Sequence, residues 1–257
     1  MNGAEKVKQY SFVLKQLVSR EIKRRYARSY LGIVWSILNP LLSMAVISFV
    51  FSQMFIRSIE NYPVYYLSGT IIWSMFTGVT NSAMTALVDN KMLLIKSKLP
   101  TRIFPLTRAV SSLVNFGFSL VAYLIILLVF KIPFRWHTLL FFVYSIGVFA
   151  FSLGLGYLLS VLYVYFGDIK HLYSVLLSLW MFLSAIFYPI EATPIEAQKI
   201  IRENPIFLYV NSIRRCILRG ELPTSGEWIR MILWSVGMYM LGRFVFGRMQ
   251  NKIMQRV

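Results

Sequence analysis

The 257-residue sequence is poor in charged side chains and has almost no cysteine. Charged residues make up 14% of it, whereas soluble domains average about 25%. A single cysteine, Cys216, excludes an intramolecular disulfide and a cysteine-rich metal site. The first 28 residues hold eight Lys and Arg and no uninterrupted apolar core, so we expect no signal peptide and a cytoplasmic N-terminus.

Charges are missing altogether from five long blocks of the sequence. A membrane-spanning helix needs about 20 apolar residues, because a hydrocarbon core of ~30 Å is crossed at ~1.5 Å per residue. Four of the blocks exceed this length and the fifth nearly reaches it. The sequence therefore excludes a soluble globular protein and also a disordered one, which has too little apolar surface to bury. The blocks are residues 29–56, 61–88, 109–130, 138–167 and 172–190.

The pattern predicts an all-α integral membrane protein with a single transmembrane domain over residues 1–257. The last span is weaker because it contains Arg230 and Arg243, but both lie near its ends and reach lipid headgroups along their aliphatic stems. Residues 4–28 place apolar side chains near the helical period, which predicts an amphipathic helix at the membrane interface. The six expected spans are residues 32–56, 64–88, 106–130, 139–165, 170–189 and 228–247.

The net charge of +17 is explained by membrane topology. With the N-terminus inside, the predicted inner segments carry 18 Lys and Arg and the outer segments carry nine. This ratio follows the positive-inside rule and predicts that both termini are cytoplasmic. No nucleic-acid-binding motif accompanies the charge, so no nucleic-acid partner is expected.

Two connecting segments carry helix signals of their own. Residues 89–101 form a basic, helix-forming loop on the predicted cytoplasmic side, where a partner protein can bind. Residues 191–227 form the longest outer loop, in which Thr193 and Glu196 predict a helix start. A second helix, at about residues 206–219, is too short and too charged to span the membrane. The loop is therefore expected to form a re-entrant or surface-lying hairpin.

The sequence lacks the groups that ion coupling or catalysis needs. No Asp or Glu lies inside a predicted span, which argues against proton or cation coupling. No phosphate-binding loop of the GxxxxGK type is present, so the chain is not expected to bind ATP in that way. An HExxH motif, paired carboxylates at membrane depth and a nucleophile motif are also missing, so we expect neither enzyme activity nor a metal site.

Several spans carry weakly polar faces, for which two explanations stay open. Small residues let helices approach closely in lipid, and polar residues line a pathway. The first, third and fourth spans contain Ser36, Asn39, Pro40 and Ser43; Arg108, Ser112, Asn115 and Ser119; and Gly147, Ser152, Gly154, Gly156 and Ser160. Aromatic rings either anchor a span at the interface or stack on the apolar faces of sugars. The rings considered for the second role are Trp35, Trp73, Phe76 and Trp180.

The stretch from residue 17 to residue 42, LVSREIKRRYARSYLGIVWSILNPLL, resembles the N-terminal signature of ABC-2 type permeases. The nearest subgroup is the membrane subunit of bacterial polysaccharide exporters, which move O-antigen, teichoic acid or capsule. Gly167 stands in place of the arginine that the family usually has before Asp168-Ile169. Further segments that resemble the family are Leu94-Ile95-Lys96, Leu99-Pro100, Phe187-Tyr188-Pro189-Ile190, Asn204-Pro205 and Arg214.

The resemblance implies a multi-pass homodimer in the bacterial inner membrane, bound to two copies of a separate ABC ATPase. ATP and Mg would be held by that partner, so no cofactor is expected in this chain. The implied substrate is a lipid-linked glycan made in the cytoplasm, such as O-antigen. Residues 4–28 and 89–101 would receive the motion of the ATPase, and the hairpin at residues 191–227 would gate the exit.

These considerations assign candidate residues to four roles. The substrate pathway is assigned to Trp35, Asn39, Trp73, Phe76 and Trp180. The approach of the lipid pyrophosphate is assigned to Arg24, Arg25 and Arg28, for which lipid headgroups are an equal alternative. ATPase coupling is assigned to Asp89, Asn90, Lys96 and Lys98, with the positive-inside rule as the alternative role of the lysines. The outer gate is assigned to Tyr188, Pro189, Asn204, Pro205 and Arg214.

Three alternative functions stay open at this point. An ABC-2 permease for a drug or small lipid would have the same span pattern. A membrane-embedded transferase would turn over a lipid-sugar substrate without an ATPase. A passive channel would conduct independently of a nucleotide-binding partner.

Overall fold

The computed structural model describes residues 3–26, 30–52, 54, 59, 61–96 and 99–256, whose regular structure is entirely helical. This confirms the predicted all-α class. The longer helices are α1 (Gly3–Tyr26), α2 (Tyr30–Phe51), α3 (Tyr62–Asp89), α5 (Ile103–Val129), α6 (Leu140–Tyr165) and α10 (Ser225–Arg256). The shorter ones are α4 (Lys91–Lys96), α7 (Ile169–Leu183), α8 (Ile195–Glu203) and α9 (Pro205–Arg214). Two 3₁₀ turns, η1 (Trp136–Leu139) and η2 (Ile190–Ala192), and one π-helical turn, η3 (Arg215–Arg219), complete the described chain.

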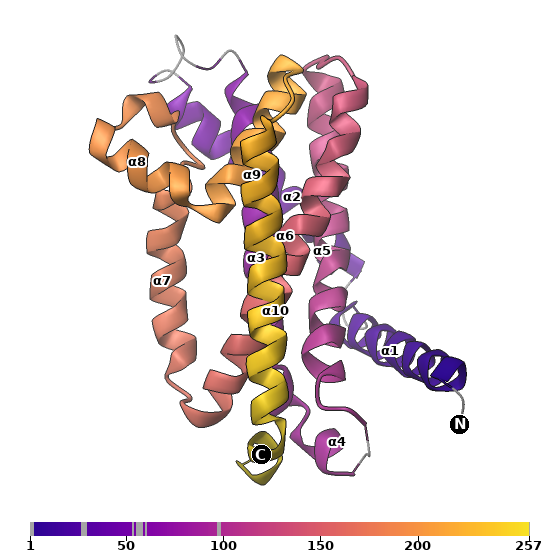
Figure 1. Cartoon of the computed structure of the whole chain (residues 1–257). Coiled ribbons are helices and arrows are strands. Elements are labelled where there is room, and N and C mark those ends of the chain that lie inside the picture. The colour runs from indigo at the N-terminus through magenta and orange to yellow at the C-terminus, as the bar shows by residue number, and fades with distance from the viewer. Residues whose placement is uncertain are drawn as a thin grey trace.

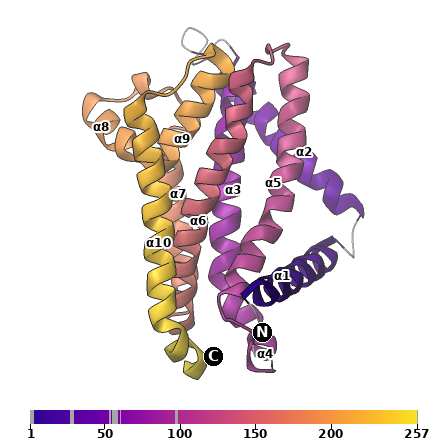
Figure 2. The same cartoon turned by 45° about the vertical axis from the view of Figure 1, so that its right-hand side comes forward.

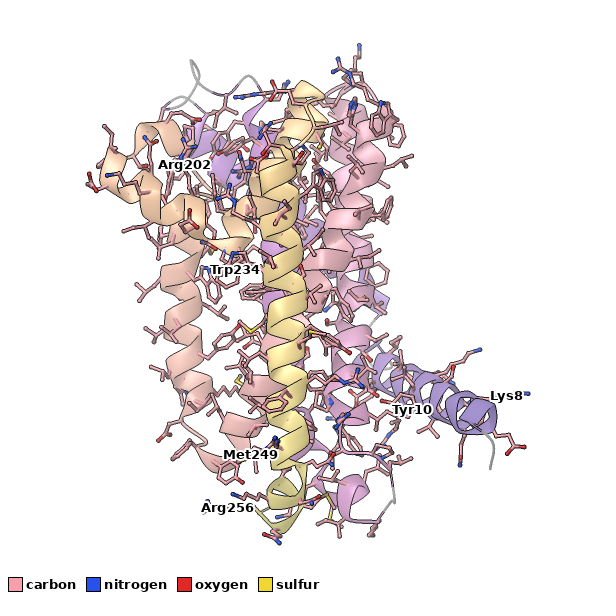
Figure 3. The ribbon with its side chains drawn as sticks, viewed as in Figure 1. Lys8, Tyr10, Arg202, Trp234, Met249 and Arg256 are labelled. Atoms are coloured by element: carbon pink, nitrogen blue, oxygen red, sulfur yellow. The ribbon has the colours of Figure 1, made fainter. Side chains whose placement is uncertain are left out.

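The long helices form an upright bundle with two distinguishable ends (Figures 1 and 2). Helix α4 and both chain termini lie at one end, which we name the inner end. Helix α8 lies at the opposite, outer end. Labelled side chains mark the two ends, with Lys8 and Arg256 toward the inner end and Arg202 on α8 (Figure 3). Helix α1 projects sideways from the bundle, as a helix that rests on a membrane surface would.

In the described part of the chain, five segments are long and apolar enough to cross a membrane: α2, α3, α5, η1 with α6, and α10. Helix α10 extends over the sixth predicted span despite its two arginines. Helix α7 has only 15 residues, which is about 22 Å and shorter than a ~30 Å hydrocarbon core. The six-span count stays a prediction.

The end predicted for the fifth span, residue 189, is wrong for the helix itself. Helix α7 ends at Leu183, and Ala185 adopts a left-handed conformation with φ of 46°. A non-glycine residue in that region does not continue a right-handed helix. The chain therefore turns sharply at residues 184–189, inside the segment that the apolar pattern assigned to a span.

Close packing in the bundle depends on small residues of α6. A Cβ atom on Gly154 would lie 2.4 Å from the carbonyl oxygen of Met238 on α10. On the other side, a Cβ atom on Gly156 would lie 2.6 Å from the Cβ of Ala83 on α3. Of the two explanations for the small residues of the fourth span, helix packing therefore accounts for these glycines.

A second apolar cluster at the inner end joins α4 and α1 to the long helices α3, α5, α6 and α10. Leu94 of α4 is buried together with Phe104 of α5 and Phe246 of α10. Tyr10 and Leu17 of α1 pack against the same cluster. The interface helix and the loop helix α4 are thus parts of one packed unit.

Candidate functional site

A polar cleft of about 370 Å³ opens between α2, α3 and α5. The stripes recognised on the first and third spans meet there, and α3 adds a third set of polar side chains. Every residue that lines the cleft is uncharged. The lining consists of Ser36, Asn39, Pro40, Ser43, Tyr66, Thr70, Ile71, Trp73, Ser74, Asn115, Ser119 and Met181.

Three hydroxyl groups of the cleft, those of Ser36, Thr70 and Ser74, already donate their protons within their own helices. Ser36 Oγ donates to the carbonyl of Gly32 at 2.8 Å, and Ser74 Oγ donates to the carbonyl of Ile71 at 2.9 Å. Thr70 Oγ1 likewise lies 3.1 Å from the carbonyl oxygens of Tyr66 and Leu67 in the preceding turn. These oxygens keep free lone pairs, so the cleft offers hydrogen-bond acceptors to a ligand. Such a surface suits a neutral, hydroxyl-rich molecule better than an ion.

The predicted pathway aromatics divide into three groups. Trp73 lines the cleft, while Trp35 is 56% exposed on α2 and is not part of the lining. Phe76 is fully buried, with ring centroids 5.5 Å from Trp73 and 5.2 Å from Trp180. Trp180 donates its indole N–H to Asn204 Oδ1 at 2.9 Å. Asn39 is exposed and lines the cleft.

The buried guanidinium of Arg214 makes three hydrogen bonds at the outer end. Its Nη1 and Nη2 donate to the carbonyls of Ala185 and Ile186, both at 2.8 Å, and its Nε donates to the carbonyl of Tyr65 at 3.2 Å. The guanidinium also lies 3.4 Å from the centroid of the Tyr65 ring. Only 5% of Arg214 is exposed, and the ion pairs of the described residues do not include it. Gly69 leaves the necessary space, because a Cβ there would lie 2.7 Å from Nη2.

Asn204 makes a second set of contacts with the end of α7. Its Nδ2 donates to the carbonyl of Leu183 at 2.9 Å and to Ser184 Oγ at 3.0 Å. Its Oδ1 accepts the backbone N–H of Ile206 at 2.9 Å, which caps α9 one residue before its first position, Pro205. Asn204 and Arg214 together hold the turn at residues 184–189, and we name this group of contacts the outer latch.

Tyr188 and Pro189 belong to the turn that the outer latch holds. The carbonyl of Tyr188 accepts the Tyr65 hydroxyl at 2.8 Å, and Pro189 is buried just before η2. Tyr62 donates to the carbonyl of Phe187 at 2.7 Å. The predicted gate residues therefore lie together. Tyr62 and Tyr65 were not predicted to belong to the gate, because local patterns mark them only as interfacial aromatics.

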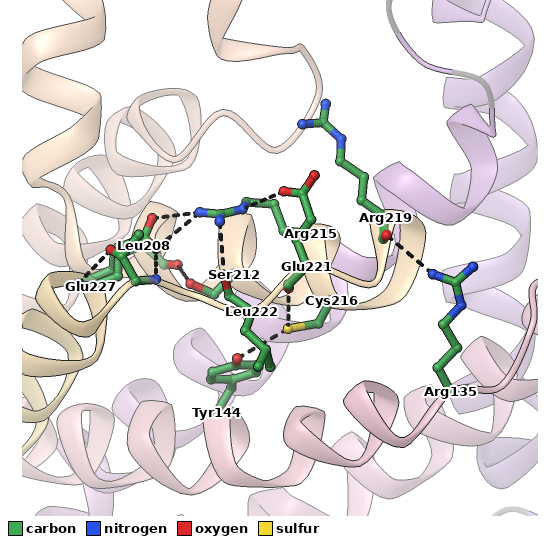
Figure 4. A network of polar contacts seen from close by, with 11 residues as sticks. Arg135, Tyr144, Leu208, Ser212, Arg215, Cys216, Arg219, Glu221, Leu222 and Glu227 are labelled. Atoms are coloured by element: carbon green, nitrogen blue, oxygen red, sulfur yellow. Dashed lines mark hydrogen bonds and ion pairs between the residues drawn. The ribbon is translucent and has the colours of Figure 1, made fainter.

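A charged network fixes η3 to the start of α10 (Figure 4). Arg215 pairs with Glu227 at 2.9 Å and with Glu221 at 3.3 Å. Beside it, the buried Cys216 thiol contacts the Tyr144 hydroxyl at 3.3 Å. Burial raises the pKa of this thiol, so it stays protonated and unreactive.

The predicted start of α8 differs from the structure. Helix α8 begins at Ile195 with Pro194 in the N-cap position and no side-chain cap. Thr193 Oγ1 instead donates to the carbonyl of Ile190 at 2.7 Å, and Glu196 pairs with Lys199. The capping box is absent because the Thr193 hydroxyl is hydrogen-bonded to the preceding turn and does not cap α8.

Ion pairs join three helices at the inner end. Arg108 of α5 lies 2.9 Å from Asp89 at the end of α3 and 3.4 Å from Glu21 of α1. Asn90 Nδ2 donates to the carbonyl of Ala86 at 2.9 Å, which closes the end of α3. Arg108 was predicted only as part of a polar face of the third span, and its role as a link between α1 and α3 was not predicted.

The other predicted inner residues make fewer contacts. Lys96 is exposed at the end of α4. Arg24 lines a small cleft of about 140 Å³ that also includes Glu21 and Arg108. Arg28, Lys98 and the side chain of Arg25 lie outside the described residues. Where the chain is described, His, Cys, Asp and Glu nowhere form a group of three that could hold a metal ion.

Comparison with known proteins places this arrangement in a family. An O-antigen export system permease protein RfbA from Myxococcus xanthus is 31% identical over 230 residues, covering 89% of this chain and 88% of that protein. An RfbA of the same description from Klebsiella pneumoniae is 23% identical, covering 93% of both chains. The polysialic acid transport protein KpsM of Escherichia coli is 21% identical, covering 81% of this chain and 82% of that protein. The pattern that defines ABC-2 type transporters matches residues 13–218, and the chain belongs to this family.

Proposed function

We propose that this chain is the membrane permease subunit of an ABC exporter that moves a polysaccharide out of the cytoplasm. The observation that carries the proposal is its similarity, over about nine-tenths of both chains, to a permease named for O-antigen export. The chain is not itself an enzyme in this proposal. ATP hydrolysis, with its ATP and Mg, belongs to a separate nucleotide-binding subunit.

The polar cleft supports a glycan as the cargo. It brings uncharged acceptor oxygens and the Asn39 amide into an otherwise apolar bundle. A sugar chain presents hydroxyl donors and apolar ring faces, which match these oxygens and the Trp73 ring. Weak neutral contacts of this kind guide a polymer without holding it. A cation or a phosphate finds no opposite charge in the cleft lining.

The packed inner end supports coupling to an ATPase through α1 and α4. Leu94 anchors α4 in the apolar cluster, while Met92 and Ile95 are exposed and available to a partner. The Arg108 ion pairs connect α1 with α3. Because α3 lines the polar cleft, a displacement of α1 would be transmitted to the wall of the cleft. Asp89, Asn90, Lys96 and Lys98 form the polar surroundings of this contact in the proposal.

The complete assembly that we propose is a homodimer with two ATPase copies in the bacterial inner membrane, with both termini cytoplasmic. Its cargo is linked to a lipid whose pyrophosphate approaches Arg24, Arg25 and Arg28. The hairpin at residues 191–227 is re-entrant and gates the exit, with the outer latch as its hinge. Six spans per subunit require that α7 crosses the core together with the turn that follows it.

Export by a Trp73→Ala, Asn39→Leu double variant tests the proposal. In a strain that depends on this chain for its surface glycan, we expect at least a several-fold loss of surface glycan, because the cleft loses its ring and its amide. Co-purification with the ATPase should be unchanged. The matched control is Trp136→Ala, which removes an exposed tryptophan that does not line the cleft. Normal surface glycan in the double variant, or export of a drug or small lipid in its place, would contradict the proposal.

A further inference from the structure

An apolar groove runs along the inner half of α10 beside three arginines. Its volume is about 690 Å³, and its apolar wall includes Val236, Met240 and Phe244. These residues recur every four positions and therefore share one face of the helix. Met240 is 65% exposed, and Arg102, Arg243 and Arg248 complete the inner part of the lining. Helix α10 lies on the side of the bundle opposite α2 (Figures 1 and 2), and no residue lines both this groove and the polar cleft.

The three arginines have no acidic partner in the described chain. The ion pairs there include none of them, and the groove lining contains no carboxylate. Arg102 lies over α10 at Gly247, where a Cβ atom would come within 2.9 Å of its Nη2. Its Nε is buried and has no hydrogen-bond partner. The Arg248 guanidinium lies 5.0 Å from the centroid of the Phe244 ring.

The groove residues of α10 extend over about the length of one lipid leaflet, with the charged ones toward one end. The twelve positions from Val236 to Arg248 correspond to about 18 Å of helix, and one leaflet contributes about 15 Å of hydrocarbon. Val236 and Met240 lie toward the middle of the helix, near Trp234, whereas Arg243 and Arg248 lie nearer the C-terminus with Phe244 between them (Figure 3). A ligand that fills this groove has an anionic head and an apolar tail.

We propose that the groove binds an anionic phospholipid of the inner leaflet. Arg102, Arg243 and Arg248 hold its phosphate, and one acyl chain lies over Phe244, Met240 and Val236. The lipid, and not a lipid-linked cargo, is the occupant, because the groove shares no lining residue with the polar cleft. The site does not depend on what the chain transports, so it stands or falls separately from the proposed function.

Native mass spectrometry of the purified full chain with phosphatidylglycerol tests the charged part of the site. We expect phosphatidylglycerol to be retained in preference to phosphatidylcholine. An Arg243→Gln, Arg248→Gln double variant should lose about 30-fold in affinity for phosphatidylglycerol, because each interfacial cation contributes about fivefold. The control is Arg202→Gln, Arg256→Gln, which removes two exposed arginines that do not line the groove. Equal losses in both pairs, or no loss in the first, would overturn the proposal.

The Met240→Trp variant tests the apolar part without changing charge. We expect it to displace phosphatidylglycerol, while glycerol 3-phosphate, which has the headgroup alone, binds neither form of the chain. Binding of glycerol 3-phosphate as tight as that of phosphatidylglycerol would make this a free-phosphate site. Preferential binding of a polyprenyl phosphate would assign the groove to a lipid carrier, and a changed oligomeric mass of Met240→Trp would assign it to a second copy of the chain. Each of these three results would overturn the proposal.

Discussion

Helices α2 and α6 are almost equally apolar, but they are buried to very different extents. In the most apolar stretch of η1 and α6, 50% of the residues are buried within the chain, compared with 11% in α2. The difference lies in the glycines that face another helix. Helix α6 presents Gly154 and Gly156 to its neighbours, whereas α2 exposes Val46 and Phe49. Apolar composition therefore reports contact with an apolar medium of any kind, and small residues report contact with another helix.

Helix α7 is a third case, because polar contacts at one end position it. Only Tyr173 and Leu177 of this helix are buried, and most of its large apolar side chains are exposed. The outer latch holds its C-terminal end through Asn204 and Arg214. An apolar helix can thus be placed by hydrogen bonds at its end when its sides lack close partners.

The largest effect is expected from Gly154→Val in α6. A side chain there would meet the backbone of Met238 and Tyr239, and neither helix can yield without separating from the other. We expect destabilisation on the order of 5 kcal/mol, measured as a fall in the thermal unfolding midpoint of the purified chain in detergent. Gly237→Val is the matched control, because nothing lies within 4 Å of a Cβ at that position. Similar midpoints for the two variants would show that small residues do not set the α6–α10 packing.

A smaller effect is expected from Arg214→Gln, which extends the comparison to α7. The shorter amide cannot reach the carbonyls of Ala185 and Ile186 together, so at least one buried acceptor loses its partner. We expect a loss of about 3 kcal/mol in stability and faster proteolysis at the turn after α7. Arg219→Gln, in the exposed part of η3, serves as the control and should change neither measurement. If Arg214→Gln were as stable as the unaltered chain, the outer latch would not be what holds α7 in place.

The smallest effect is expected from Phe49→Ala in α2, where the side chain is 85% exposed. The stability of the single chain should change by less than about 0.5 kcal/mol. The same truncation in α6, Phe151→Ala, removes a buried ring and should cost about 3–5 kcal/mol. If Phe49→Ala lowered the unfolding midpoint as much as Phe151→Ala, the contrast between the two helices would fail. A loss that depends on protein concentration would instead place Phe49 in a contact between copies.

The sequence pattern predicted a helix well where the residues of that helix alone determine its ends. The charge-free blocks located α2, α3, α5 and α6, and the second helix expected in the outer loop, at about residues 206–219, located α9 and η3. The end of α7 was missed because it depends on Arg214, about 30 positions away. No periodicity in residues 170–189 contains that information.

The candidate site was predicted in part for the same reason. The stripes at Asn39 and Asn115 were visible as spacings, and they do face one cleft. The contribution of Thr70 and Ser74 was missed, since hydroxyls in an apolar span follow no distinctive rule. Phe76 was grouped with Trp73 because both are aromatic, but packing against Trp180 buries it completely. Which ring of a membrane helix meets a cavity is decided by neighbours that the linear pattern does not reveal.

The seclusion of the Cys216 thiol has a practical consequence for mapping this protein. It is the chain's only cysteine, and burial among Tyr144 and the η3 backbone keeps a maleimide reagent away from it. A cysteine introduced at any exposed position would then react alone, against a silent native background. Sidedness of each loop, and the distance between matching points on two copies, can be measured in the otherwise unaltered polypeptide.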